Sequence, residues 1–86
     1  MRSAAVTVGT TPTLLIAADD IPRTVYIHVV GNSTVYLGNA NVTTTNGLAT
    51  EKHTAPLTFF VPQGETIYAI VAAETANVRI LTPDVD

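Results

Sequence analysis

The two histidines are the first candidates for chemistry in this chain of 86 residues. A zinc site needs three or four ligands drawn from His, Cys, Asp and Glu. His28 and His53 would therefore require Glu51 or Asp20 beside them, and no ligand spacing in the sequence supports such a cluster. The chain has no cysteine, so thiolate ligands are excluded as well. We expect neither a metal nor another cofactor.

Nucleophilic catalysis and calcium binding find equally little support. Ser3 or Ser33, with a histidine and an aspartate, would supply the residue types of a catalytic triad, but no strand-to-helix elbow would hold the serine. Asp19 and Asp20 are adjacent and lack the alternating acids of a calcium-binding loop. They precede Ile21-Pro22, a turn sequence in which aspartates accept hydrogen bonds from nearby amides. The sequence therefore predicts a protein that is not an enzyme.

Charged residues are scarce, at 13% of the chain against about a quarter in an ordinary soluble domain. The net charge is −3 and the four basic residues are scattered, so we expect no binding to nucleic acid or to an anionic membrane. The longest apolar run, Ile67–Ala73, is far shorter than the roughly 20 residues of a membrane span. Residues 1–5 lack the apolar segment of a secretory signal, and we expect synthesis in a cytoplasm.

β-branched residues dominate the apolar runs, and Pro, Gly and Asn separate these runs at short intervals, which predicts an all-β protein. We expect one domain over residues 1–86, an antiparallel β-sandwich or small β-barrel of about seven strands. Residues 1–10 fit either an N-terminal arm or an edge strand, and residues 82–86 form a short acidic tail. The expected strands are Ala5–Val8, Thr13–Ala17, Val25–Val30, Thr34–Leu37, Leu57–Val61, Ile67–Ala72 and Val78–Leu81.

The segment Val25–Leu37 predicts a β-hairpin. Its central Gly31-Asn32 supplies the positive φ angles that a tight hairpin turn needs. The hairpin would place Tyr26 and Tyr36 side by side on adjacent strands. Such a pair is either ordinary cross-strand aromatic packing or a platform for a sugar ring.

The strand Leu57–Val61 carries two further local patterns. Phe59 and Phe60 point to opposite faces, so one belongs to the core and the other needs a cover, for which a partner protein is suitable. The sequence Pro62-Gln63-Gly64-Glu65 follows, with glycine at the third position, as a type II turn prefers.

Residues 38–55 form a long polar segment with little internal pattern. Asn46-Gly47 is a turn dipeptide, and Val42–Thr44 is expected to form a short edge strand before it. Loops of this length are often functional, so this segment is a candidate for partner contact. The residues expected to bind a partner are Asn39, Asn41, Val42, Thr43, Thr44 and Thr45, together with Tyr26 and Tyr36.

Between Arg23 and Leu81, several turns and core segments together form a pattern that can be compared with known proteins. They are Gly31-Asn32-Ser33, Val35–Gly38, Asn41–Thr43, Asn46–Leu48, Phe60–Glu65, Ile67–Ile70 and Ala76–Ile80. This combination resembles the small β proteins encoded among the virion structural genes of tailed bacteriophages. The likeness covers most of the chain, and its motifs are structural.

The resemblance implies a capsid decoration (cementing) protein that oligomerises, most often as a trimer, and stabilises the major capsid protein lattice. It places the protein on the capsid exterior of the virion, after synthesis in the bacterial host cytoplasm. The alternatives are a minor tail or head–tail component of the same fold, or a glycan-binding surface module that uses Tyr26 and Tyr36. Low charge agrees with burial on a lattice, because it lowers the cost of removing a large surface from water.

Overall fold

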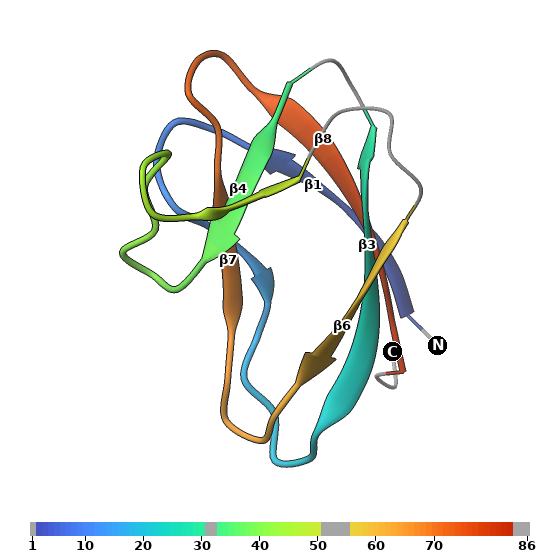
Figure 1. The fold of residues 1–86 in the computed structure, drawn as a ribbon. Helices are drawn as coiled ribbons and strands as arrows, with labels where there is room; N and C mark the ends of the chain where they lie inside the picture. The colour runs from blue at the N-terminus through green and yellow to red at the C-terminus, as the bar shows by residue number, and fades with distance from the viewer. Residues whose placement is uncertain (1, 31–32, 51–55, 84–86) are drawn as a thin grey trace.

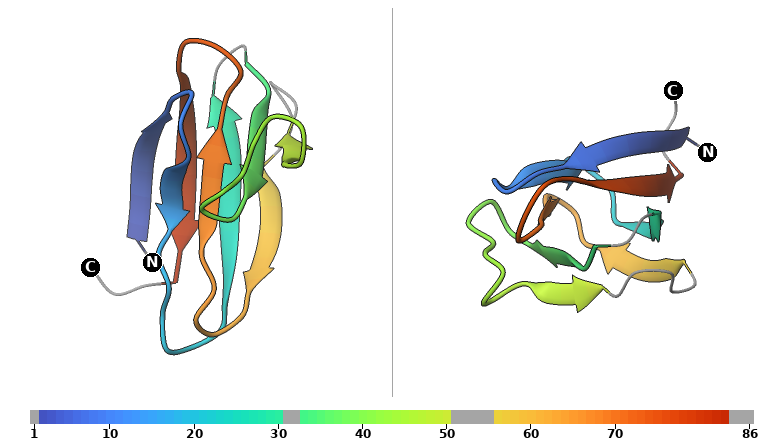
Figure 2. Two further views of the ribbon diagram at one scale, coloured as in Figure 1. Left: turned by 90° about the vertical axis from the view of Figure 1, so that its left-hand side faces the viewer. Right: turned by 90° about the horizontal axis from the view of Figure 1, so that it is seen from above.

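Eight β-strands make up the computed structural model, which describes residues 2–30, 33–50 and 56–83 (Figure 1). The strands are β1 (Arg2–Val8), β2 (Thr13–Ile16), β3 (Arg23–Val30), β4 (Val35–Gly38), β5 (Leu48–Thr50), β6 (Leu57–Val61), β7 (Ile67–Ile70) and β8 (Ala76–Thr82). Sheet A has the strand order β1-β8-β3-β6, and sheet B has the order β2-β7-β4-β5. All pairs are antiparallel, and the two sheets form the small β-sandwich that the sequence predicted (Figure 2).

The strand order follows one winding pattern from the chain ends inward. In sheet A, β1 pairs with β8 and β3 pairs with β6. In sheet B, β2 pairs with β7 and β4 pairs with β5. The paired ends therefore alternate between the two sheets until the chain reaches its central hairpin, β4–β5. This is the arrangement of an eight-stranded jelly roll.

The core lies between the two sheets and is built by alternation along the strands. In β3 and β8 every second residue is buried, as expected for strands with one face on the core. The buried hydrophobic cluster is dominated by β-branched side chains, which pack well on a pleated surface. Its members are Val8, Leu15, Ile16, Val25, Ile27, Val29, Val35, Leu37, Val61, Ala69, Val71, Ala76, Val78 and Ile80.

The hairpin predicted over Val25–Leu37 is wrong, because β3 and β4 belong to different sheets. Both edges of β3 are occupied, one by β6 and the other by β8. The apolar faces of β3 and β4, represented by Ile27 and Leu37, both join the core cluster. The two runs therefore pack face to face across the core instead of edge to edge. The central Gly31-Asn32 lies outside the described residues.

One other local prediction is wrong, and the structure decides between the two alternatives for residues 1–10. Val42–Thr44 is not a strand; it belongs to the loop between β4 and β5. The edge strand of this region is β5 at Leu48–Thr50, which the sequence did not reveal because its alternation is too short to recognise. At the start of the chain, Arg2–Val8 forms an edge strand that pairs with β8 along its whole length.

The turn chemistry read from the sequence is confirmed at one end of the sandwich. Gly64 has a φ of 81°, and the Glu65 N–H donates to the Pro62 carbonyl at 3.1 Å, as in a type II turn. The Asp20 N–H donates to Asp19 Oδ1 at 2.6 Å. The Gly64 N–H also donates to the Asp19 carbonyl at 2.9 Å. This bond joins the β6–β7 turn to the β2–β3 connection.

Arg23 adds a buried cation at the start of β3, with only 4% of its surface exposed. Its Nη2 donates to the Ala17 carbonyl at 2.6 Å, across the connection from β2. A buried charge is tolerated only where polar partners replace water. Arg23 therefore fastens the β2–β3 connection to the end of sheet A.

Candidate functional site

The outward-pointing side chains of sheet A form the surface that we call the A face. Side chains alternate along a strand, so the residues between the inward-facing ones all point to this side. The A face consists of Ser3, Ala5 and Thr7 from β1, Asn77, Arg79 and Leu81 from β8, Thr24, Tyr26, His28 and Val30 from β3, and Thr58 and Phe60 from β6. An outward face of an antiparallel sheet is normally polar, and this one is interrupted by large apolar side chains.

Four of the seven exposed large hydrophobic side chains among the described residues lie on the A face. They are Phe60, Tyr26, Val30 and Leu81, which are 67%, 41%, 40% and 39% exposed. Tyr26 is directly opposite Leu81 in the β3–β8 pair. In the β3–β6 pair Tyr26 faces Thr58, which places Phe60 on the diagonal, within reach of an aromatic ring. Tyr26, Leu81 and Phe60 therefore form an apolar patch across three strands.

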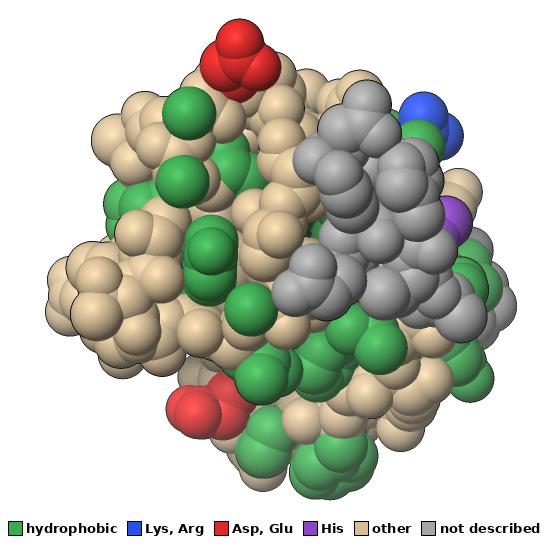
Figure 3. Space-filling model, turned by 45° about the horizontal axis from the view of Figure 1, so that its top comes forward, with side chains coloured by type: hydrophobic (Ala, Val, Ile, Leu, Met, Phe, Trp, Pro, Cys, Tyr) green, Lys and Arg blue, Asp and Glu red, His purple; other side chains and the backbone are tan. Residues whose placement is uncertain are grey.

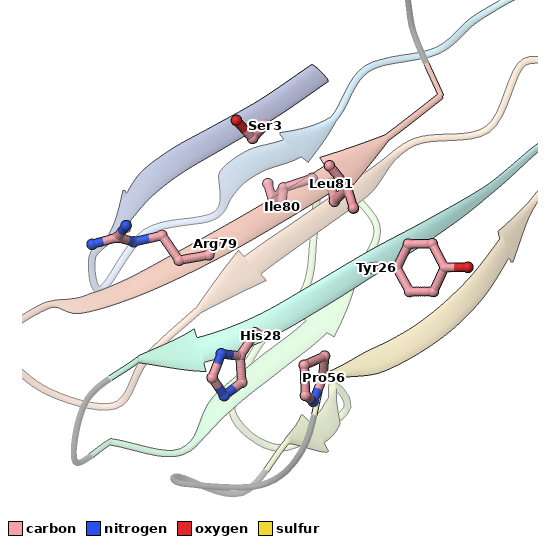
Figure 4. Close-up of a pocket in the computed structure, with 7 residues that line it drawn as sticks. All are labelled: Ser3, Tyr26, His28, Pro56, Arg79, Ile80 and Leu81. Carbon is pink, nitrogen blue, oxygen red and sulfur yellow. The ribbon is translucent and has the colours of Figure 1, made fainter. Parts of the chain in front are cut away.

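A shallow groove of about 380 Å³ runs over this patch toward β1 (Figure 4). It is lined by Ser3, Tyr26, His28, Pro56, Arg79, Ile80 and Leu81. His28 and Arg79 are opposite one another in the register, but Figure 4 shows the Arg79 guanidinium turned away from His28 toward β1. The middle of the groove is thereby left to the side chains of Tyr26 and Leu81.

The groove presents mainly apolar surface, together with a few side chains that can form hydrogen bonds. Among the described residues that line the groove, the polar side chains are Ser3, Tyr26, His28 and Arg79. The groove therefore combines the apolar area of Tyr26 and Leu81 with a few hydrogen-bonding side chains.

Tyr26 and Tyr36 do not form the shared aromatic platform predicted from the hairpin. Tyr26 lies on the A face, whereas Tyr36 lies in β4 of sheet B. The neighbours of Tyr36 in its strand, Val35 and Leu37, are buried inward, so Tyr36 points to the other outer side of the sandwich. The core separates the two rings, and the predicted sugar platform is wrong in its geometry.

Phe59 and Phe60, in contrast, occupy the positions predicted for them. Phe59 packs against the core cluster, and Phe60 is the most exposed large hydrophobic side chain of the described residues. The sequence predicted that one of the two points outward, without deciding that it is Phe60. The neighbourhood of Phe60 was not predictable, because it depends on β3 and β8.

The loop between β4 and β5, residues 39–47, is held together by its own polar side chains. Asn39 Oδ1 accepts from the Asn41 N–H at 2.9 Å, and Asn46 Oδ1 accepts from the Thr43 N–H at 2.8 Å. Thr43 Oγ1 in turn accepts from the Asn46 N–H at 3.2 Å. These are the turn-forming bonds that Asn and Thr make readily. Part of the polar character that marked this loop as a contact surface is therefore used inside the loop.

Val42 anchors the same loop and is only 2% exposed. A Cβ placed on Gly38 or Gly47 would lie 2.8 Å or 2.9 Å from Val42 Cγ2, so the glycines leave the room that this side chain fills. Val42 therefore cannot offer its side chain to a partner without opening the loop. The other residues expected to bind a partner here are exposed: Asn39, Asn41, Thr43, Thr44 and Thr45.

Figure 3 shows how sparse charge is on one side of the molecule. The visible acidic side chains stand far apart, at the top and at the lower left, and hydrophobic side chains gather between them (Figure 3). The projection at the left, where Figure 1 places the β4–β5 loop, carries neither charged nor hydrophobic colour.

The residues considered for metal binding are dispersed. His28 is half-buried on the A face and Asp20 is exposed in the β2–β3 connection, whereas His53 and Glu51 lie outside the described residues. Within the part of the chain that the structure describes, no group of three or more His, Cys, Asp or Glu is placed to hold a metal ion. The same part contains no helix with the length and apolarity that a membrane crossing requires.

Comparisons of the chain with protein-family models, with curated proteins and with solved structures found no match. The A face is the surface that carries most of the exposed large hydrophobic side chains among the described residues. The sequence signal that points to it is local: Phe60 and Leu81 are large apolar residues at outward positions of strands whose inward positions are already apolar.

Proposed function

We propose that this protein is a structural component of a bacteriophage virion, a capsid decoration protein whose A face lies against the outer surface of the major capsid protein. The observation that carries the proposal is the apolar patch of Tyr26, Leu81 and Phe60 on an open sheet face. Exposed apolar patches on soluble proteins mark interaction sites, because water contact with them is unfavourable.

The charge distribution supports docking on another protein. Arg79 and His28 are the only titratable side chains besides Tyr26 among the residues of the A face. Burial of such a surface removes few charges from water, and so carries a small desolvation cost. A single copy gains modest contacts, but many copies on a repeating lattice reinforce the shell together.

The architecture is compatible with this role and does not select it. Jelly rolls occur in viral capsid proteins, lectins and cupins, and one fold serves many functions. A minor tail or head–tail component would use the same apolar face on a different partner. The copy number in purified particles distinguishes these roles, since decoration requires hundreds of copies and a tail or connector requires a handful.

Purified capsids that lack the protein provide the test. Added wild-type protein is expected to bind them and to raise the temperature at which they open, whereas the Tyr26→Asp/Leu81→Asp variant is expected to do neither. The matched control is Thr44→Asp/Thr45→Asp, which places the same two charges on the exposed β4–β5 loop. The proposal fails if wild-type protein does not bind the shells, or if the A-face variant protects them as well as wild type does.

A further inference from the structure

The four edge strands of the sandwich differ in how well they resist pairing with another chain. Exposed edges of natural sheets are normally blunted by short length, bulges, proline or charge. β5 has only three residues, β2 has an irregular register between Leu14 and Ile16, and β6 lies between Pro56 and Pro62. Three of the four edges therefore carry such a feature.

β1 carries none of them along its length. It has seven residues, its register with β8 is unbroken from Arg2 to Val8, and it contains no proline. Its single charged residue, Arg2, lies at one end. Figure 2 (left) shows β1 as the outermost strand of sheet A, beyond β8. Ser3, Ala4 and Ala5 are small, so a second strand can approach closely on either face.

The sequence of β1 is also complementary to itself. In an antiparallel pair of two β1 strands centred on Ala5, that residue faces Ala5 of the second copy, and all seven residues find a partner. Ser3 then faces Thr7, and Ala4 faces Val6. Arg2 faces Val8 at the two far ends, so the cations stay apart. Apart from Arg2–Val8, every pair consists of small, apolar or hydroxyl-bearing residues, and no like charges meet.

We propose that two copies of the chain pair through β1 around a two-fold axis at Ala5, which joins two A sheets into one sheet of eight strands. The trimer implied by the sequence resemblance would need two different surfaces in contact, whereas this edge is self-complementary. The inference does not depend on the capsid role. If that role holds, the two A faces point to the same side and dock together, which strengthens binding by avidity.

Cysteine crosslinking tests both the pairing and its register, because the chain has no cysteine of its own. Directly opposed residues of antiparallel strands have Cα atoms about 4.5 or 5.5 Å apart, within the range of a disulfide. Ala5→Cys is therefore expected to form a covalent dimer under mild oxidation. Ser3→Cys is the matched control on the same strand and face, since its two copies would be about 14 Å apart.

A charge introduced at the same position provides a second test, in which light scattering measures the mass of the protein in solution. Wild type is expected at the mass of two chains, and Ala5→Glu and Ala5→Lys are each expected to lose the dimer. A mixture of the two variants is expected to recover it, because opposite charges then meet at the axis. Thr58→Glu, on the opposite edge strand β6, is expected to remain dimeric.

The pairing is overturned if wild type is a monomer or a trimer at high concentration, or if Ser3→Cys crosslinks as readily as Ala5→Cys. It is also overturned if Thr58→Glu dissociates the dimer while Ala5→Glu does not. All these measurements use the isolated protein. A failure of capsid binding therefore leaves them unaffected, and a dimer that ignores capsids would reject only the capsid role.

Discussion

The A face and the β4–β5 loop are both poor in charge, but they are built in opposite ways. The loop is made by neighbours in the sequence, and its Asn and Thr side chains bond to amides two or three residues away. The A face joins Tyr26 to Leu81 and Phe60, which come from three strands of sheet A. The loop uses its polar groups internally, whereas the face leaves its apolar groups exposed. Exposed apolar area without an internal use is the better indication of a partner.

The largest expected effect is a loss of docking affinity when the apolar side chains of the A face are removed. Tyr26→Ala/Leu81→Ala should weaken docking about 100-fold, equivalent to about 2.7 kcal/mol, because central aromatic and apolar contacts dominate protein interfaces. Both side chains are partly exposed, so the loss in the free energy of unfolding in urea should be smaller than the loss in docking. Binding isotherms on capsids measure the first effect. A comparable loss of stability would mean that these residues support the fold and not a partner.

The next effect concerns the anchor of the loop. Val42→Ala should lower the free energy of unfolding by about 2 kcal/mol, because it removes buried methyl groups and leaves a cavity. Thr44→Ala, on the exposed part of the same loop, is the control and should change stability by less than about 0.5 kcal/mol. Denaturant unfolding followed by circular dichroism provides both values. Equal values for the two variants would contradict the anchoring role of Val42.

A smaller change is expected from overfilling the same site. Gly47→Ala would place its Cβ 2.7 Å from Tyr36 Cβ and 3.0 Å from the Thr43 carbonyl oxygen. The loop must shift to relieve this contact, and we expect a loss of about 1 kcal/mol in the free energy of unfolding. Gly9→Ala is the matched control, because a Cβ there meets nothing within 4 Å. Thermal unfolding of the two variants side by side measures the difference.

The smallest effect is expected from charge on the loop surface. Thr44→Glu should leave stability within about 0.5 kcal/mol of wild type, since this side chain is exposed. It should also weaken docking no more than a few-fold, as rim charges do. A loss as large as that of the A-face variant would move the docking site to the loop, where the sequence first suggested it.

Local chemistry was the part of the fold that the sequence could predict. Three confirmed features depend on residues that are close in the chain. They are the turn at Pro62–Glu65, the hydrogen bond from the Asp20 N–H to the Asp19 carboxylate, and the opposite faces of Phe59 and Phe60. Seven of the strands were also recognisable, since alternation and β-branched residues mark them directly.

Long-range pairing was the part that the sequence could not predict. Gly31-Asn32 suits a hairpin, yet the flanking strands face each other across the core, because both have an apolar side to bury. The candidate site was affected in the same way. The sequence grouped Tyr26 with Tyr36, whereas its neighbour Leu81 is brought beside it only by the β3–β8 pair.

The pairing of β1 with β8 has a consequence for how the molecule reaches its native state. Arg2 is opposite Thr82, so β1 must wait for β8, which is far from it in the sequence, before sheet A is complete. Closing so large a loop is entropically unfavourable, and topologies dominated by such contacts fold on the order of milliseconds to seconds. Sheet A is therefore completed only after the segment between β1 and β8 has been made, and removal of β8 should leave β1 without its neighbour and the chain prone to aggregation.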